Sequence, residues 1–169
     1  MTDFRTELAA LHDESFSWAA SCCGGESTLA ADILQTVYLK ILDGRAKFGG
    51  QSALKTWLFS VIRNTAADEC RRRSREDAGL AIFAADSDFE TAEAPDELLS
   101  REQRHSSLRD ALAALPARQQ EVLRLAFFHG LSLAEVADVT RISIGSVRQH
   151  YERGKQRLRD LLHSINTTP

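Results

Sequence analysis

The sequence is poor in the residues that build turns and disulfides. Only 3 of its 169 residues are proline, 9 are glycine and 7% are aromatic. β-Sandwiches and barrels need many turns, so this scarcity favours helices and predicts an all-α fold. The 3 cysteines, Cys22, Cys23 and Cys70, contain no C-x-x-C pair, and an odd number argues against a disulfide scaffold. We therefore expect reduced thiols.

Long hydrophobic runs are also absent. Acidic side chains at Asp3, Glu7, Asp13 and Glu14 interrupt the N-terminal segment, so we expect no signal peptide. No stretch approaches the length of a membrane span, which predicts a cytoplasmic protein without membrane insertion. The net charge of -3 is too small to indicate a nucleic-acid binder by itself, so the distribution of charge must decide.

The patterns expected of an active site or a metal site are missing too. The 5 histidines are scattered without metal-ligand spacing, at His12, His105, His129, His150 and His163. The chain contains no glycine-rich phosphate loop. We expect no enzyme, no cofactor and no metal site.

What the sequence does contain is helical periodicity. Apolar spacing predicts N-terminal helices over 3–21, 29–42 and about 53–73, with Ser27 or Thr28 as a cap. Further helices are expected over these residues: 102–114, 118–128, 132–138 and 143–163. Within the third helix, Trp57, Leu58, Val61 and Ile62 are expected to be buried, Trp57 as a core aromatic.

The composition shifts between the two groups of helices. Residues 76–102 are acidic and show little periodicity, which is typical of a linker between domains. The expected organisation is a helical domain over 1–75, an acidic linker over 76–102 and a second helical domain over 103–169.

A helix-turn-helix is predicted in the C-terminal domain. Pro116 begins a helix that His129 and Gly130 end. Ser132 and Ser143 are placed to cap the two following helices. The small residue Ala137 would let the two helices cross closely, and the residues expected to face inward on the second helix are Ile144, Val147 and Tyr151.

The second of these helices presents polar side chains suited to DNA. A helix fits the major groove, and arginine or glutamine can make two hydrogen bonds to a base edge. Basic residues further along the helix suit phosphates. The candidate DNA-contacting residues are Ser146, Arg148, Gln149, His150, Glu152, Arg153 and Lys155.

Taken together, the two halves resemble the extracytoplasmic-function sigma factors of bacterial RNA polymerase, in the sigma-70 family. The segments that carry the resemblance are 30–35 (AADILQ), 56–64 (TWLFSVIRN) and 114–123 (ALPARQQEVL). The resemblance implies a region 2 domain that reads the -10 promoter element and a region 4 domain that reads the -35 element. It also implies that both dock on core RNA polymerase, through its beta and beta-prime subunits.

The resemblance assigns sites in the N-terminal domain. The helix over 29–42 would dock on the polymerase through Asp32, Gln35, Thr36 and Leu39. The -10 element would be bound by Phe48, Gln51, Ser52, Arg63, Asn64, Arg71 and Arg72. Capture of an unstacked base needs an aromatic ring and a nearby amide, which the loop at 48–52 and Asn64 supply.

The chain departs from the family pattern on the docking helix. Leu29, Ala31 and Thr36 occupy positions where acids are common, so docking should be weaker. Phosphorylation of Thr36 would add about -1.5 to -2 charges there, so a Ser/Thr kinase could switch the factor on. Ser27, Thr28 and Thr56 are alternative acceptors. The other interpretation is an interface that has drifted and tolerates Thr36, and control by an anti-sigma factor is the other possibility.

A second departure and a second function stay open. Glu152 stands where relatives often have a bulky residue, and glutamate can accept from cytosine but repels phosphate.

The alternative function is a dimeric helix-turn-helix regulator that binds operators and does not open promoters.

Overall fold

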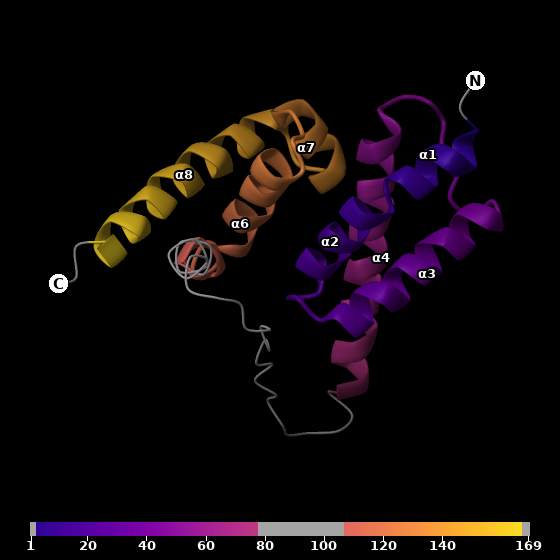
Figure 1. Ribbon diagram of the computed structural model, residues 1–169, viewed down its shortest axis with the longest axis horizontal. Coiled ribbons are helices and arrows are strands. Elements are labelled where there is room, and N and C mark those ends of the chain that lie inside the picture. The colour runs from indigo at the N-terminus through magenta and orange to yellow at the C-terminus, as the bar shows by residue number, and fades with distance from the viewer. Residues whose placement is uncertain (1–2, 78–106, 167–169) are drawn as a thin grey trace, which may run out of the picture. The chain divides into compact units, whose positions relative to one another are not determined.

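The computed structural model describes residues 3–77 and 107–166. Within those ranges every regular element is a helix, which confirms the all-α prediction. The helices form two compact units, α1 to α4 in one, and α6, η1, most of α7 and α8 in the other (Figure 1). The predicted linker at 76–102 lies outside the described residues, apart from its first two, which end α4. None of the described helices is both long enough and apolar enough to cross a membrane.

The N-terminal unit is a bundle of three helices, and a short helix precedes them in the chain. These are α1 (Phe4–Ala10), α2 (His12–Cys22), α3 (Ser27–Leu42) and α4 (Leu54–Asp77). Helices α2, α3 and α4 each pack against the other two, and α1 packs against α2. Helix α1 has no buried residue, so the core belongs to the other three.

That core is apolar and is organised around one tryptophan. Trp18 is 1% exposed, its Nε1 donates to the backbone oxygen of Phe59 over 3.1 Å, and the two rings stack at 5.8 Å. The prediction that Trp57 is the core aromatic is wrong, because Trp57 is only half-buried. Trp57 lies next to the buried residues Leu58 and Phe59 on α4. Apolar spacing predicts that the helix has a buried face, but it does not show how wide that face is.

Two predicted helix boundaries also need correction. The helix expected over 3–21 is interrupted at Leu11, which has φ of -90° and ψ of 2° and separates α1 from α2. Helix α3 begins at Ser27 with Glu26 at the N-cap and without a side-chain cap, so Ser27 and Thr28 do not act as caps. Its end at Leu42 matches the predicted range of 29–42, and Gly44 takes a φ of +69° just after it.

The C-terminal unit places four helical segments around a second core. Residues 107–113 are helical, followed by α6 (Ala117–Leu123), α7 (Leu133–Thr140) and α8 (Ile144–Asn166). Leu112, Leu115 and Leu123 are buried together, and half-buried side chains pack against them, among them Tyr151 and Leu158. The first helical segment, α6 and α8 are therefore held by one apolar cluster.

The helix predicted over 118–128 changes its winding partway. After α6, the π-helical turn η1 (Arg124–Phe128) continues the chain, and the N–H of His129 donates to the oxygen of Arg124 over 3.3 Å. Phe127 and Phe128 are 57% and 60% exposed on this wide turn. Gly130, with φ of +65°, follows, so the predicted end at 129–130 is confirmed.

A close crossing of α6 and α8 depends on Gly154. A Cβ added to Gly154 would lie 3.0 Å from Cδ1 of Leu123 and 3.3 Å from Cβ of Gln119. The small residue expected at a helix crossing was Ala137, and Gly154 was not predicted. A glycine inside a helical pattern was the available signal, since glycine costs stability there unless packing requires it.

Candidate functional sites

The two helices of the predicted helix-turn-helix begin as the sequence indicated. Ser132 and Glu135 form a capping box: the N–H of Glu135 donates to Oγ of Ser132 over 3.3 Å, and Oε2 of Glu135 accepts from the N–H of Ser132 over 2.8 Å. At α8, Oγ of Ser143 accepts from the N–H of Ser146 over 3.1 Å. The predicted caps at Ser132 and Ser143 are confirmed, and they fix where each helix starts.

The turn between these helices contains one unusual backbone conformation. Arg141 has φ of +55°, the only positive φ of a non-glycine residue among those described. That left-handed region is costly for residues with a Cβ. The direction in which α8 leaves the turn therefore depends on a strained residue, which no sequence pattern predicted.

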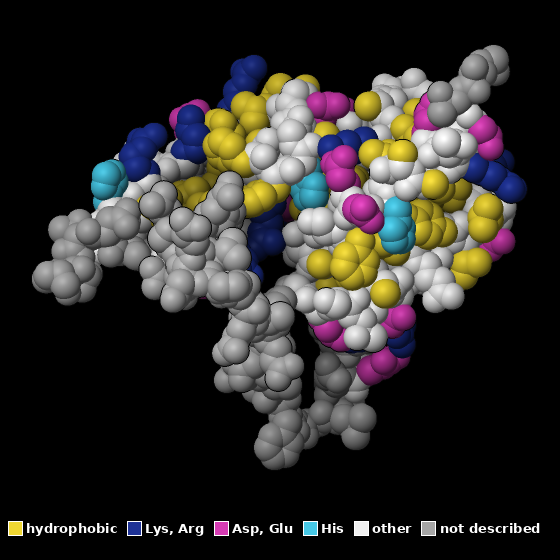
Figure 2. Space-filling view, in the orientation of Figure 1, with side chains coloured by type: hydrophobic (Ala, Val, Ile, Leu, Met, Phe, Trp, Pro, Cys, Tyr) yellow, Lys and Arg dark blue, Asp and Glu magenta, His cyan; other side chains and the backbone are white. Residues whose placement is uncertain are grey.

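The first turns of α8 bury Val147 and expose the side chains around it. Val147 is fully buried, as predicted, whereas Ile144 is 42% exposed, so its predicted inward position is wrong. Basic side chains gather along α8 in the space-filling view (Figure 2). Four of the candidate DNA-contacting residues are exposed: Arg148, Gln149, Glu152 and Arg153.

Of the other three candidates on α8, two make local contacts and the third is partly covered. Oγ of Ser146 lies 2.9 Å from Oγ of Ser143, within the helix cap. Nζ of Lys155 lies 3.2 Å from Oε1 of Glu152 and 4.6 Å from the ring centroid of Tyr151. His150 is half-buried. Lys155 thus offsets the repulsion that Glu152 would exert on a phosphate.

The loop assigned to the -10 element lies between α3 and α4 and carries an aromatic ring. Its backbone is irregular over 47–53, with φ of +70° at Gly50. The Phe48 ring lies 5.4 Å from that of Trp57, and both side chains are half-buried. Gln51 is exposed and Ser52 is half-buried. The loop therefore combines a ring at the surface with amide and hydroxyl groups.

The amide expected beside this loop comes from α4. Asn64 lies two helical turns after Trp57, so the two share a face of the helix, and both are half-buried. Arg63 is half-buried next to it. Helix α4 thus positions the amide along the same face as the ring that Phe48 contacts.

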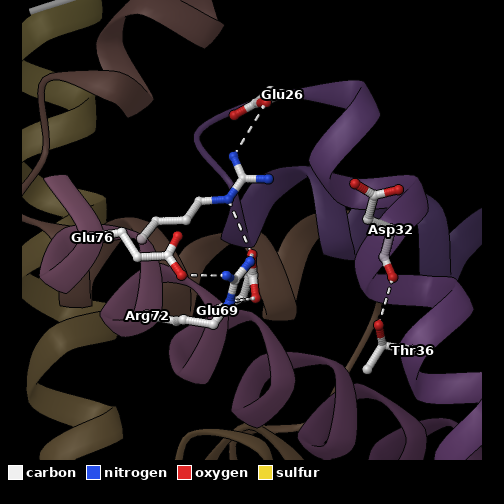
Figure 3. Close-up of polar contacts among 7 residues, drawn as sticks. Glu26, Asp32, Thr36, Glu69, Arg72 and Glu76 are labelled. Carbon is white, nitrogen blue, oxygen red and sulfur yellow. Dashed lines mark hydrogen bonds and ion pairs between the residues drawn. The ribbon is translucent and has the colours of Figure 1, made fainter.

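The arginine cluster at the end of α4 is paired with acidic side chains (Figure 3). Arg71 lies 2.5 Å from Asp68, and Arg72 lies 2.6 Å from both Glu69 and Glu76. Arg73 contacts Glu69 at 3.1 Å and Glu26 at 3.6 Å. The positive charge of Arg71 and Arg72, which the resemblance assigned to the -10 element, is therefore balanced by acidic residues of the same chain.

Glu69 is the centre of this network. Hydrogen bonds from Arg72 and Arg73 lower its pKa to about 2, and contact with Glu69 raises the pKa of both arginines above the usual value. The helix supplies these contacts because residues three and four apart meet on its surface. A phosphate that binds Arg72 has to replace carboxylates that are already in contact with it.

The residues assigned to polymerase docking form one exposed face of α3. Asp32, Gln35, Thr36 and Leu39 are all exposed, and their spacing places them on one side of the helix. Oγ1 of Thr36 donates to the backbone oxygen of Asp32 over 2.9 Å (Figure 3). Leu29 does not belong to this face: it is 4% exposed, so its assignment to a docking position is wrong.

Two family models match the chain in the order of its two units. The model "Sigma-70 region 2" matches residues 9–76, and "Sigma-70, region 4" matches residues 105–158. The first match covers α2 to α4, and the second covers the helix-turn-helix.

Individual proteins match over most of the chain. The chain is 33% identical to the ECF RNA polymerase sigma factor SigX of Bacillus subtilis, over 76% of this chain and 68% of that protein. It is 32% identical to the RNA polymerase sigma factor CarQ of Myxococcus xanthus, over 81% and 76%.

A solved structure matches over nearly the whole length. The sigma factor RpoE of Bartonella quintana, determined in complex with the anti-sigma factor NepR, aligns with a TM-score of 0.73. That alignment covers 96% of this chain and 98% of RpoE at 25% identity.

Proposed function

We propose a function from one premise: the chain belongs to the sigma-70 family of RNA polymerase sigma factors, among its extracytoplasmic-function members. In this proposal the chain binds core RNA polymerase and directs transcription initiation at a specific set of promoters. The N-terminal unit contacts the -10 element, and the C-terminal unit contacts the -35 element. The supporting observation is the pairing of the two family regions, in order, on two compact helical units.

Run-off transcription is the direct test of this proposal. Purified chain is added to core polymerase with fragmented genomic DNA as template, and transcripts are mapped against reactions without the chain. We expect new start sites with a shared upstream sequence. A dimeric regulator of operators would bind DNA without core polymerase and produce no new start site.

We place the main contact with core polymerase on the exposed face of α3. Asp32 contributes the acid on this face, while Leu39, 48% exposed, contributes apolar surface. Charged contacts at an interface mainly set specificity and association rate, and apolar contacts add affinity. A face with one acid is expected to bind a basic partner more weakly than a face with several.

Phosphorylation of Thr36 by a Ser/Thr kinase is the proposed way to strengthen this contact. Thr36 is exposed, and its hydroxyl is engaged only locally, with the backbone of Asp32. A phosphate on Oγ1 replaces that hydrogen bond and puts about -1.5 to -2 charges one helical turn from Asp32. The face would then resemble the more acidic docking face that the family pattern implies.

A pull-down of core polymerase tests the switch. Thr36→Glu is expected to bind core about fivefold more tightly than the wild type, which corresponds to one added charged contact of about 1 kcal/mol. Thr36→Ala should bind as the wild type does. Ser17→Glu, which adds the same charge at an exposed position of α2, is the matched control. Equal binding by Thr36→Glu and Ser17→Glu would rule the switch out.

An anti-sigma factor is the alternative regulator. The structurally similar RpoE was solved with its anti-sigma factor, which supports this class of partner for the present chain. Co-purification of the chain from cells of its source would decide between a bound inhibitor and a kinase that modifies Thr36.

Reading of the -35 element is assigned to the exposed residues of α8. Arg148→Ala is expected to weaken discrimination at one or two base pairs by about 1–3 kcal/mol. Arg157→Ala removes the same charge from an exposed position further along α8, and should weaken binding to all sequences alike. Holoenzyme binding to promoter variants and to random DNA measures both. If Arg148→Ala lowered affinity for random DNA just as much, it would not read bases.

A further inference from the structure

Three aromatic rings from three separate segments meet beside the loop assigned to the -10 element. Phe4 begins α1, Phe48 lies in the loop and Trp57 lies on α4. The Phe4 ring lies 6.3 Å from that of Phe48, nearly parallel at 22°, and 6.5 Å from that of Trp57. The resemblance to known sigma factors assigned Phe48 to DNA but gave no role to Phe4.

This aromatic group (Phe4, Phe48 and Trp57) is separate from the hydrophobic core. The core aromatics Trp18 and Phe59 are 1% and 0% exposed, whereas Phe4 is 37% exposed and the other two rings are half-buried. Helix α1 has no buried residue. The contacts of Phe4 with the other two rings therefore do not complete the core; they join α1 to the loop.

Two glycines in the loop have open space around them. Its backbone is irregular over 47–53, and Gly49 and Gly50 are exposed, with no atom close to where a Cβ would be. Glycines without neighbours leave the backbone many conformations. Ring pairs at separations of 4.5–7 Å are attractive beyond the area they bury. Two such contacts from one residue can hold the loop against α4.

From this geometry we propose that Phe4 is a positioning residue for the -10 loop. Through Phe48 and Trp57 it braces residues 47–53, so that the loop is already shaped to receive an unstacked base before DNA arrives. A brace formed in advance lowers the conformational entropy lost on binding. The role in initiation rests on the proposed sigma-factor function, whereas the brace itself is a property of the free chain.

The free chain allows a test of the brace alone. Trypsin cleaves after Lys47, an exposed residue just before Phe48, and native cleavage requires the loop to open locally. Phe4→Ala is expected to speed cleavage after Lys47 about tenfold, and Phe4→Tyr, which keeps the ring, to restore the wild-type rate. Thr6→Ala, at an exposed position of α1, is the matched control. Equal cleavage rates for Phe4→Ala and Thr6→Ala would overturn the brace.

Tryptophan fluorescence gives an independent measure in the same samples. Trp18 is buried, so acrylamide mainly quenches Trp57. Phe4→Ala should make the emission more sensitive to acrylamide, because it uncovers the Trp57 ring. Emission quenched equally in the wild type and Phe4→Ala would show that Phe4 does not cover Trp57, and would also overturn the proposal.

Holoenzyme then tests the consequence for initiation. On a promoter identified by run-off transcription, Phe4→Ala should lower transcript yield about tenfold from duplex DNA, and less from a template already melted at the -10 element. Core polymerase should still bind Phe4→Ala and the wild type equally. Undiminished transcription by Phe4→Ala would overturn the role in initiation. A wild-type chain that gives no promoter-specific transcript would instead contradict the sigma-factor function, while proteolysis and quenching would still decide the brace.

Discussion

Single residues set the geometry of the helix-turn-helix more than its hydrophobic pattern does. Arg141 takes a left-handed conformation in the turn, and Ser143, two residues later, caps α8. The first residue turns the chain at a cost, and the second stabilises the helix that results. The exposed side chains of α8 are aimed by this pair of residues.

Replacing Arg141 with glycine should stabilise the C-terminal unit. The left-handed region costs a residue with a Cβ about 1–2 kcal/mol, and glycine offsets part of the gain through its greater freedom in the unfolded chain. We expect the free energy of unfolding to rise by about 1 kcal/mol in urea denaturation. Arg148→Gly, which loses the same charge within α8, should lower it by a similar amount. A loss of stability in Arg141→Gly would contradict the argument.

At the scale of the helices, two sets of contacts matter. One is the row of ion pairs along α4, and the other is the packing of α6 against α8. The network on α4 needs residues three and four apart on one surface, and one of its arginines also reaches Glu26, outside that helix. The crossing of α6 and α8 needs a glycine where side chains of α6 press against α8. Both arrangements can be tested with matched variants on the same helix.

The ion pairs of Glu69 on α4 predict how the stability of the protein depends on pH. The folded pKa of Glu69, about 2, is below the usual value of 4.5, so its ion pairs stabilise the fold above about pH 4.5. That stabilisation is lost as pH falls through 2. Glu69→Gln should therefore melt at a lower temperature than the wild type at pH 7, with the difference shrinking towards pH 2.

Glu76→Gln is the control for this measurement, because Glu76 contacts Arg72 alone within the network. Its effect on the melting temperature should be the smaller of the two. Glu69→Gln should also bind DNA more tightly at low salt, since two arginines lose a competing carboxylate. A difference from the wild type that stayed constant between pH 7 and pH 2 would show that Glu69 is not the titrating group.

The close crossing of α6 and α8 predicts opposite effects for two glycines of one helix. Gly154→Ala gains up to about 1 kcal/mol in helix propensity but overpacks Leu123 and Gln119, which typically costs about 1–3 kcal/mol. We expect a net loss of about 1 kcal/mol in the free energy of unfolding. Gly145→Ala, whose Cβ would meet only Oγ of Ser143 at 3.8 Å, should be neutral or stabilising. Stabilisation by both alanines would contradict the crossing.

At the scale of the whole molecule, the chain contains two separate hydrophobic cores. One is built around Trp18 and Phe59, and the other around Leu112, Leu115 and Leu123. Because each unit buries its own apolar surface, unfolding is not expected to be a single two-state transition.

Calorimetry should therefore resolve two thermal transitions. Gly154→Ala should lower one melting temperature and leave the other unchanged, and Glu69→Gln should do the reverse. One transition that both substitutions shift would show that the units unfold together.

The parts of this molecule that the sequence predicted are those that depend on neighbouring residues. The caps at Ser132 and Ser143 and the end of a helix at Gly130 follow from local chemistry, and all were found as expected. The order of the two family regions was also visible in short motifs. Local signals of this kind need no knowledge of which helix packs on which.

What the sequence did not predict depends on three-dimensional packing. Trp18 and Trp57 both lie at helical spacing from apolar residues, and only the bundle decides that Trp18 is central. For the arginine cluster, the contact between Arg73 and Glu26 depends on packing, whereas the acidic partners of Arg71 and Arg72 lie three or four residues away on α4 and could have been paired from helical spacing alone. Phe4 lies in the segment whose apolar spacing predicted the helix over 3–21, and that spacing gives no sign of its contact with a loop more than forty residues away.

The π-helical turn at η1 also constrains how this chain can change in length. A π turn holds one more residue than an α turn, and each residue of an α-helix advances the chain by about 100°. Deleting one residue between Arg124 and Phe128 would let the segment wind as an α-helix, so the wide turn that exposes Phe127 and Phe128 would be lost while the residues after it keep roughly their direction. A change of one residue in length is therefore absorbed within this segment, whereas the same change inside α6 would rotate the helix-turn-helix that follows.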